Sequence, residues 1–157
     1  MPKFAAAATD FTTPITTPDT AIMLQPDAAG EAGEVVEAIM TGSGITTAAD
    51  TQHTAQLRFS DGTGNGTGTA QTAQQLDQGS AVSEVTVTIE HSAEPSTISA
   101  VPAVIFGFNQ RGGMRWAVTR GEGVKFDNAE TNEDLIWDVV SVAAGKIDGL
   151  LQWWEHQ

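Results

Sequence analysis

Two stretches of the chain alternate between apolar and polar residues with a period of two. Residues 82–91 read VSEVTVTIEH, which places Val85, Val87 and Ile89 on one side of an extended chain. Residues 54–60 read TAQLRFS and repeat the pattern. This periodicity is typical of a β-strand with one face buried. Both stretches are therefore expected to be half-buried strands.

Weaker apolar runs predict further strands. Short strands are expected at residues 3–8, 21–24 and 124–126. Residues 135–142 are apolar on both faces apart from Asp138 and Ser141, which predicts a central strand that is covered on both sides.

Residues 27–42 fit two interpretations. Val35, Val36, Ile39 and Met40 have helical spacing, but two upstream glycines and the β-branched pair weaken a helix. We favour a strand at about 35–41.

The last third of the chain contains all four tryptophans and looks like two consecutive hairpins. The first would join AVIFGF to GMRWAVT through the glycine-containing turn 109–113. The second would join DLIWDVVSVA to IDGLLQWWEH through AGK. Trp153 and Trp154 are adjacent, so in a strand they point to opposite faces and one of them is expected outside the core.

These elements predict an all-β fold. About 8–10 short antiparallel strands separated by turn residues describe a β-sandwich or jelly-roll-like domain. Residues 1–20 are expected to be an extended N-terminal arm or first strand, because two Thr-Pro steps keep residues 10–19 extended. Residues 21–157 are expected to form the single β-sandwich domain. The glycine-rich run 61–69 and the polar stretch that continues to residue 80 are expected to be a mobile surface loop.

Composition narrows the class of partner. The formal net charge of −13 argues against binding nucleic acid or an anionic membrane surface, and it suits a partner with a basic face. The chain has no cysteine, which excludes disulfides and thiolate chemistry. No apolar run approaches the length of a membrane span, and the N-terminus is a poor signal peptide, so a cytoplasmic site of synthesis is expected.

No motif for catalysis or a cofactor stands out. The glycine run 62–68 does not open a helix and no lysine follows it, so a flexible loop is preferred to a phosphate site. The three histidines lack ligand spacing, and no serine has the surroundings of a nucleophile. The oxygen-rich segment 127–134 lacks the calcium-loop pattern, so a solvated acidic loop is preferred to a calcium site. The expected protein is not an enzyme, has no cofactor and holds no metal.

The aromatic residues remain as candidate functional residues. They belong either to the hydrophobic core and the ordinary surface that surrounds it, or to a subunit interface, where tryptophan and arginine are enriched. The candidate core or interface anchors are Phe106, Phe108, Arg111, Arg115, Trp116, Trp153 and Trp154.

The order of these features resembles a group of small, acidic, β-rich virion proteins of tailed bacteriophages. The stretches that carry the resemblance are VVEAIMTGSG (35–44), QLRFSDGTGNGTG (56–68), FGFNQRGGMRWAV (106–118) and LLQWWEHQ (150–157). No catalytic or ligand residue takes part in it.

The resemblance implies a non-enzymatic capsid decoration (cement) protein. Such a protein would stabilise the head by contacts with the major capsid protein, as a homo-oligomer with a trimer favoured, on a virion assembled in the host cytoplasm. Residues 10–19 would then be an arm that reaches a neighbouring subunit. The alternative is a tail, fibre or head-fibre module that binds a host surface glycan or receptor.

Overall fold

The structure is a computed structural model that describes residues 1–26, 32–43, 50–61, 64, 66–79, 81–127 and 134–156. The predicted all-β fold is confirmed. In the described part of the chain the strands are β1 (Lys3–Thr12), β2 (Asp19–Pro26), β3 (Ala32–Gly42), β4 (Gln52–Ser60), β5 (Thr67–Gln71), β6 (Gln74–Gln75), β7 (Val85–Ala93), β8 (Val104–Asn109), β9 (Met114–Ala117), β10 (Val124–Asp127), β11 (Asp134–Ser141) and β12 (Lys146–His156).

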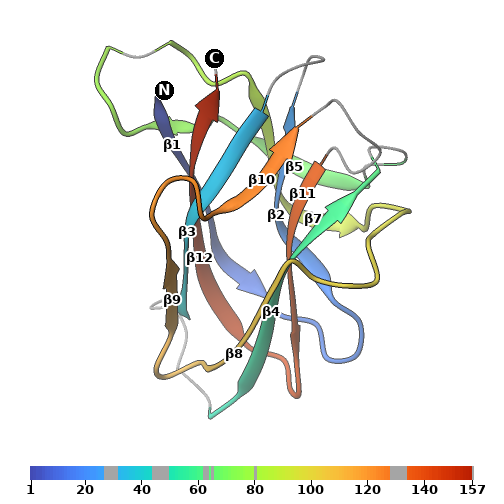
Figure 1. The fold of residues 1–157 in the computed structure, drawn as a ribbon. Helices are drawn as coiled ribbons and strands as arrows, with labels where there is room; N and C mark the ends of the chain where they lie inside the picture. Colours follow the sequence, from blue (N-terminus) through green and yellow to red (C-terminus); the bar gives the residue numbers. More distant parts are fainter. Residues whose placement is uncertain are drawn as a thin grey trace.

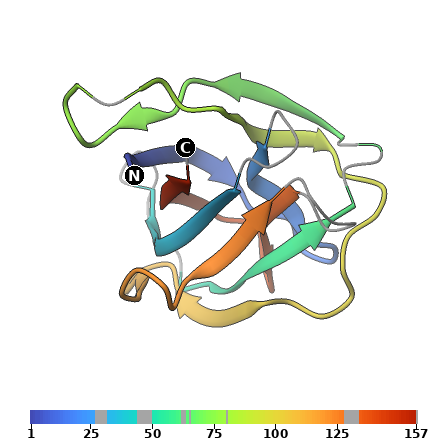
Figure 2. The same cartoon turned by 45° about the horizontal axis from the view of Figure 1, so that its top comes forward.

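The strands form two antiparallel sheets that pack face to face as a β-sandwich (Figure 1). Sheet A has the order β10-β3-β12-β1-β6, and β9 also pairs with β3. Sheet B has the order β5-β7-β2-β11-β4-β8. The two ends of the chain lie side by side at one end of the sandwich (Figures 1 and 2), because Lys3 of β1 pairs with Trp154 of β12.

Neither predicted hairpin forms. β8 pairs with β4 in sheet B, whereas β9 pairs with β3 in sheet A. In the same way β11 lies in sheet B between β2 and β4, and β12 lies in sheet A between β1 and β3. Each turn therefore crosses from one layer to the other, and the two strands that it joins send their apolar residues into one core from opposite sides.

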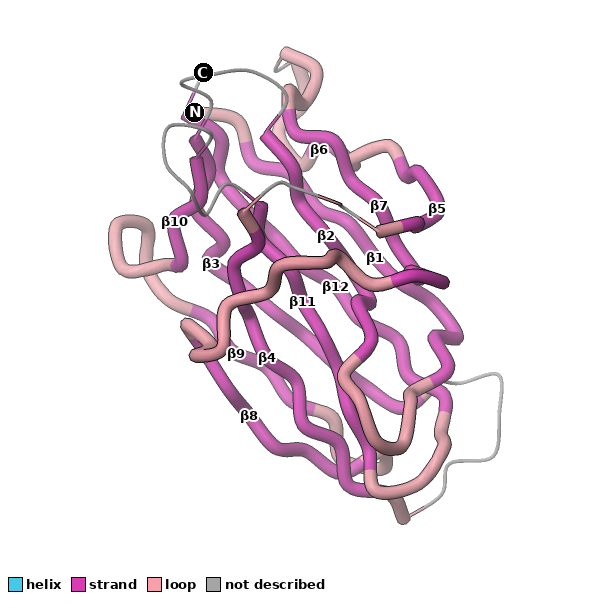
Figure 3. Tube along the Cα trace, turned by 90° about the vertical axis from the view of Figure 1, so that its right-hand side faces the viewer, coloured by secondary structure: helices cyan, strands magenta, loops and turns pink. Residues whose placement is uncertain are grey.

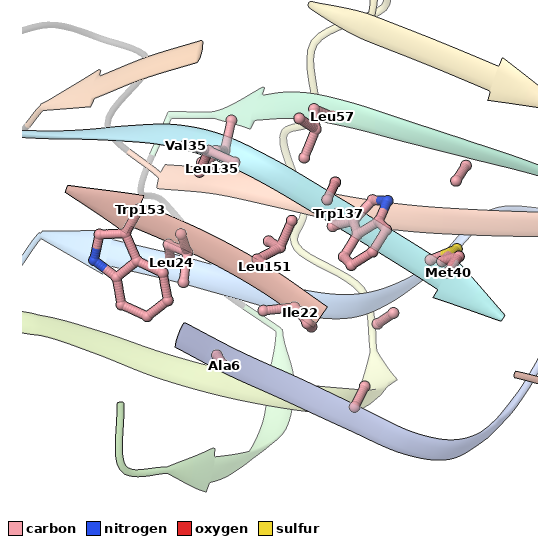
Figure 4. Close-up of a cluster of buried hydrophobic side chains, with 14 of the residues drawn as sticks. Ala6, Ile22, Leu24, Val35, Met40, Leu57, Leu135, Trp137, Leu151 and Trp153 are labelled. Atoms are coloured by element: carbon pink, nitrogen blue, oxygen red, sulfur yellow. The ribbon is translucent and has the colours of Figure 1, made fainter. Parts of the chain in front are cut away.

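The core shows why this crossing is favourable. Trp137 of β11 and Trp153 of β12 are both fully buried, and they enter the same cluster from different sheets (Figure 4). Trp153 stacks on Phe4 with ring centroids 6.0 Å apart. Gly149 allows the close approach of the two sheets, because an added Cβ there would lie 3.2 Å from Cζ3 of Trp137.

The N-terminal segment belongs to the sandwich. β1 pairs with β12 along its length and with β6 at its start. The following loop is tied to its own domain, since Thr13 N–H donates to the Gly145 carbonyl (3.0 Å) and Ser141 N–H donates to the Pro14 carbonyl (2.9 Å). Residues 13 and 14 of the expected arm thus contact the β11–β12 connection, and a reach toward a neighbouring subunit stays a prediction.

The polar stretch after residue 61 contains two strands that the sequence did not predict. β5 pairs with β7, and β6 pairs with the start of β1. Both have mostly exposed or half-buried residues, so their backbones pair at sheet edges without a hydrophobic signal. The described glycines here support tight turns, as at Gly66, where φ is +72°.

A long connection covers the outer face of sheet B. Residues 94–103 cross this face between β7 and β8 (Figure 3). The crossing is fixed where Ser99 N–H donates to the Phe59 carbonyl (2.8 Å) and Ala103 N–H donates to the Leu57 carbonyl (2.8 Å). Met23 and Ile136 on this face are fully buried, which confirms that the stretch from residue 135 to residue 141 is a strand covered on both sides. The prediction was wrong for Val142, because the strand ends at Ser141 and Val142 is 72 % exposed.

Candidate functional site

The outer face of sheet A differs from that of sheet B because its side chains stay partly exposed. Its central strand β12 alternates strictly, with Ile147, Leu151 and Trp153 inside and their neighbours outside. The outward set on β12 includes Leu150, Gln152 and Trp154, each half-buried.

The register of the strands places four residues in one row across this face. Lys3 of β1 lies opposite Trp154, Trp154 lies opposite Glu34 of β3, and Glu34 lies opposite Lys125 of β10. Glu34 is buried because the turn 118–123 folds over it. Its carboxylate accepts hydrogen bonds from the backbone N–H groups of Gly121 (2.7 Å) and Gly123 (2.6 Å).

Two cations lie over the ring of Trp154. The Lys3 ammonium is 5.9 Å from the ring centroid, and the Arg120 guanidinium is 5.8 Å from it. Such contacts stabilise a cation against an aromatic ring by about 0.5–1 kcal/mol when they are exposed. The indole therefore positions two basic groups at one end of the face.

The next rows are apolar and form a groove. Ala5 and Ala7 lie opposite Gln152 and Leu150 of β12, and their small side chains leave a pocket of about 400 Å³. Glutamine amides and Leu76 border this groove; its lining is Ala5, Ala6, Ala7, Gln71, Thr72, Gln74, Leu76, Leu150 and Gln152.

A side chain protects the free edge of β1 beside the groove. The Gln71 amide donates from Nε2 to the Ala7 carbonyl (2.8 Å) and accepts at Oε1 from the Ala7 N–H (2.9 Å). This pair of bonds imitates a neighbouring strand, which is one way in which proteins block edge-to-edge pairing.

The predicted anchor residues separate into three groups. Phe106, Phe108, Trp116 and Trp153 point inward and belong to the core or pack on it. Trp154 and Arg115 point outward on sheet A, where Arg115 Nε lies 2.6 Å from a Glu37 carboxylate oxygen. Arg111 is exposed in the β8–β9 turn.

No pattern in the sequence indicated Lys3, Arg120 or the residues of the groove as part of a site. Adjacency indicated that one of the last two tryptophans faces outward, but the neighbours of that tryptophan come from β1 and from the turn before β10. Only the strand register brings these distant residues together.

A buried ion pair lies on the other sheet, beneath the 94–103 connection. Asp138 is 1 % exposed, and its Oδ2 lies 3.2 Å from Arg58 Nε. Burial raises the pKa of Asp138 to about 7, although the Arg58 charge opposes this rise. This group is closed off from solvent, so it belongs to the stability of sheet B.

A histidine–serine pair is also buried. His53 Nδ1 lies 2.5 Å from Ser141 Oγ, and the imidazole stacks on Phe108 with centroids 5.0 Å apart. Burial lowers the pKa of His53. A nucleophile must reach its substrate, whereas Ser141 is only 4 % exposed. The pair therefore acts as a structural contact in this conformation.

Neither a metal-binding cluster nor a membrane-spanning helix occurs among the described residues. No group of three or more histidine, cysteine, aspartate or glutamate side chains there could hold a metal ion. The acidic segment 127–134, considered above for calcium, lies outside the described residues except for its two ends. The described part of the chain also contains no helix long and apolar enough to cross a membrane.

Comparisons with protein-family models, with curated proteins and with solved structures give no match to this chain.

Proposed function

We propose that this chain is a non-enzymatic structural protein of a bacteriophage virion, which decorates the capsid by docking on the major capsid protein through the outer face of sheet A. The contrast between the two sheets supports this proposal. Sheet B buries Met23 and Ile136 of its outer face, which a connection of its own chain crosses, whereas sheet A leaves Leu150, Ile39 and Trp154 half-exposed. Half-exposed apolar and aromatic side chains on one face are what a docking surface requires.

The outer face of sheet A has the composition of an interface centre with a polar rim. Leu150 and Ile39 lie opposite each other in its middle. Trp154 and the cations beside it lie at one end, and the Arg115–Glu37 ion pair flanks β3. Tryptophan and arginine carry much of the binding energy where interfaces have been mutated. A homotrimer that presents three such faces to the shell is the preferred assembly.

Sedimentation with phage heads tests the proposal. Heads of the phage that encodes this chain, assembled without it, are incubated with purified protein and pelleted. We expect saturable binding by the native chain and at least a tenfold loss for Leu150→Glu, because a charge is then buried at the contact. Ile105→Glu is the matched control, since Ile105 is 60 % exposed on β8 of the other sheet. Failure of the native chain to bind, or equal loss for both variants, would contradict the proposal.

A second candidate function is binding of a host surface glycan. The groove beside β1 favours it, because Gln74 and Gln152 line an alanine floor with amide groups. Trp154 does not favour it, because two cations already lie over its ring. Saturable glycan binding that is lost in Gln152→Ala, with no binding to heads, would establish this second function in place of the first.

A further inference from the structure

β8 is an edge strand of sheet B that lacks the usual protection of a sheet edge. It pairs with β4 on one side, and no strand of the described chain pairs with its other side. Its sequence, VIFGFN, contains no charged residue and no proline. Its register with β4 is uninterrupted from Val104 to Asn109. Short strands, charges, prolines and bulges are the means by which proteins keep an edge from pairing with another chain.

The other edges among the described strands carry such protection. β6 has two residues, and β9 and β10 have four residues each and include Arg115 and Lys125. The register of β5 with β7 is interrupted between Thr67 and Thr69. The Gln71 amide blocks β1, as described above. β8 is therefore the edge of the described sandwich that is left open to pairing.

The backbone groups that β8 turns away from β4 belong to Ile105 and Gly107. Opposite residues of an antiparallel pair alternate between hydrogen-bonded and non-hydrogen-bonded pairs. Gln110 N–H donates to the Thr51 carbonyl (2.9 Å), and these two residues extend the β4–β8 register by one position. Counted back from Gln110, the even-numbered residues of β8 bond to β4 and the odd-numbered residues face outward. Ile105 and Gly107 are both exposed, and no turn or side chain of the described chain bonds to their backbones.

A second copy of β8 satisfies these outward groups in one antiparallel register. The Asn109 carbonyl already accepts a hydrogen bond from Gly112 N–H (2.9 Å) in the β8–β9 turn, so Ile105 and Gly107 are the open residues. When Ile105 of one copy lies opposite Gly107 of the other, both open residues of each copy form hydrogen-bonded pairs. A two-fold axis then passes at Phe106, and the contact uses the same surface of both copies.

The side chains fit the same register. Ile105 is 60 % exposed, and an added Cβ at Gly107 would meet no atom closer than 3.8 Å, so each isoleucine has room to cover the glycine of the other copy. On the inner face, Phe106 meets Phe106 of the second copy in a non-hydrogen-bonded pair, where side chains are closest. Val104 lies opposite Phe108. Val104 and Phe106 are only partly buried in the single chain, so the pairing removes further apolar surface from water.

We propose that β8 pairs antiparallel with β8 of a second copy of this chain, which joins sheet B of the two copies into one continuous sheet. Main-chain hydrogen bonds give such edge pairing its affinity, and alternate side chains give it specificity. The contact lies apart from the outer face of sheet A, and it does not rest on docking to heads. A two-fold contact joins single chains into pairs, or two trimers into a closed hexamer, so the mass in solution doubles in either case.

Crosslinking through a single cysteine tests the pairing and its register. The chain has no cysteine, so Phe106→Cys introduces its only thiol. Position 106 lies opposite itself in the proposed pair, at a Cα separation of about 4.5 Å that suits a disulfide. Val104→Cys is the matched control on the same face, because position 104 lies opposite position 108. With oxidised glutathione, Phe106→Cys should form the linked pair at least about tenfold faster than Val104→Cys. Equal rates in the two folded variants would overturn the proposed register.

The molar mass by light scattering after size exclusion tests the pairing with the cysteine-free chain. About 0.5 M sodium chloride screens the repulsion between chains of net charge −13. The native chain should have twice the mass of Ile105→Glu, which places a charge on the open edge, whereas Val142→Glu, at another exposed residue, should keep the native mass. An equal mass for the native chain and Ile105→Glu, or a halved mass for Val142→Glu as well, would overturn the proposal.

Binding to heads separates this proposal from the proposed function. Leu150→Glu should keep the doubled mass and lose binding to heads, because it changes only the outer face of sheet A. Ile105→Glu should lose the doubled mass and still bind heads. Halving of the mass by Leu150→Glu, with no effect of Ile105→Glu, would place the contact between copies on sheet A and refute the pairing of β8.

Discussion

At the scale of single residues, the sandwich depends on a few buried groups whose surroundings are unusual. Asp138 is the clearest case, because neither of its carboxylate oxygens has a hydrogen-bond partner in the described structure and Arg58 is its charged neighbour. An acid whose pKa is raised on folding binds its proton more tightly in the native state than in the unfolded chain. Its stability contribution is therefore lost as pH rises.

This gives a pH prediction. The unfolded carboxyl ionises near 3.8, whereas the folded one stays protonated up to about 7. The free energy of unfolding should thus fall between about pH 4 and pH 7, with an upper limit of about 4 kcal/mol from this residue. Denaturant unfolding at a series of pH values measures this fall in the free energy of unfolding. Asp138→Asn should remove this pH-dependent part of the free energy of unfolding, whereas Glu84→Gln should keep it. A pH profile unchanged by Asp138→Asn would contradict the assignment of this pH dependence to Asp138.

A second residue-scale prediction concerns the contact between the sheets. Gly149→Ala places a methyl group 3.2 Å from Trp137, which is fully buried and has little room to move. Overpacking of this kind costs about 1–3 kcal/mol. We expect the midpoint of urea unfolding to fall accordingly. The control is Ala143→Gly at an exposed loop residue, which tests whether exchanging glycine and alanine changes stability at a site without packing. Gly79→Ala is not a suitable control, because φ is +86° at Gly79.

At the scale of elements, alternation predicted most of the strands and could not predict their partners. A period of two says which side of a strand is buried, but it does not say whether the next strand lies beside it or across the core. That is why β8 and β9, and likewise β11 and β12, look like hairpins in sequence and lie in different sheets in the structure. β5 and β6 were missed because edge pairing through the backbone leaves no apolar pattern.

The candidate site was predictable only in part for the same reason. The adjacent Trp153 and Trp154 indicated one inward and one outward ring, and the burial of the two agrees with this. The cations beside Trp154 come from positions 3 and 120, which no local pattern connects. A pocket lined by Asp10, Asp19, Glu90 and Lys146 likewise joins four strands whose order the sequence does not reveal.

The edge of β1 provides an element-scale prediction. Gln71→Ala removes both hydrogen bonds to Ala7, so the Ala7 backbone loses the partner that imitates a strand. We expect a stability loss of about 1–2 kcal/mol, and faster hydrogen exchange at the Ala7 amide than at other β1 amides. Gln78→Ala, in an exposed turn, is the matched control. Unchanged exchange at Ala7 would show that Gln71 does not protect this edge.

At the scale of the whole molecule, the two outer faces of the sandwich differ at their centres. The 94–103 connection crosses sheet B, where Met23 and Ile136 are fully buried and Ile105 on β8 stays 60 % exposed, whereas the outer face of sheet A presents Leu150, Gln152 and Trp154. The proposed docking on heads uses the outer face of sheet A.

The two adjacent tryptophans distinguish binding from folding. Trp153→Ala should cost about 3–5 kcal/mol of stability because the ring is fully buried. Trp154→Ala should change stability by less than about 1 kcal/mol and weaken the proposed binding to heads or the proposed assembly of a trimer. Thermal unfolding, light scattering and sedimentation measure the three properties. If Trp154→Ala unfolds the protein as Trp153→Ala does, Trp154 is a core residue and not an anchor.

Hydroxyl-radical footprinting of the protein, free and bound to heads, tests the docking claim most directly. The free protein should be oxidised at Trp154 and Leu150 on sheet A, and at Val142, which is 72 % exposed in the β11–β12 connection. On heads, Trp154 and Leu150 should be protected severalfold while Val142 stays reactive. Protection of Val142 with full reactivity at Trp154 and Leu150 would place the contact on another surface and contradict the proposed function.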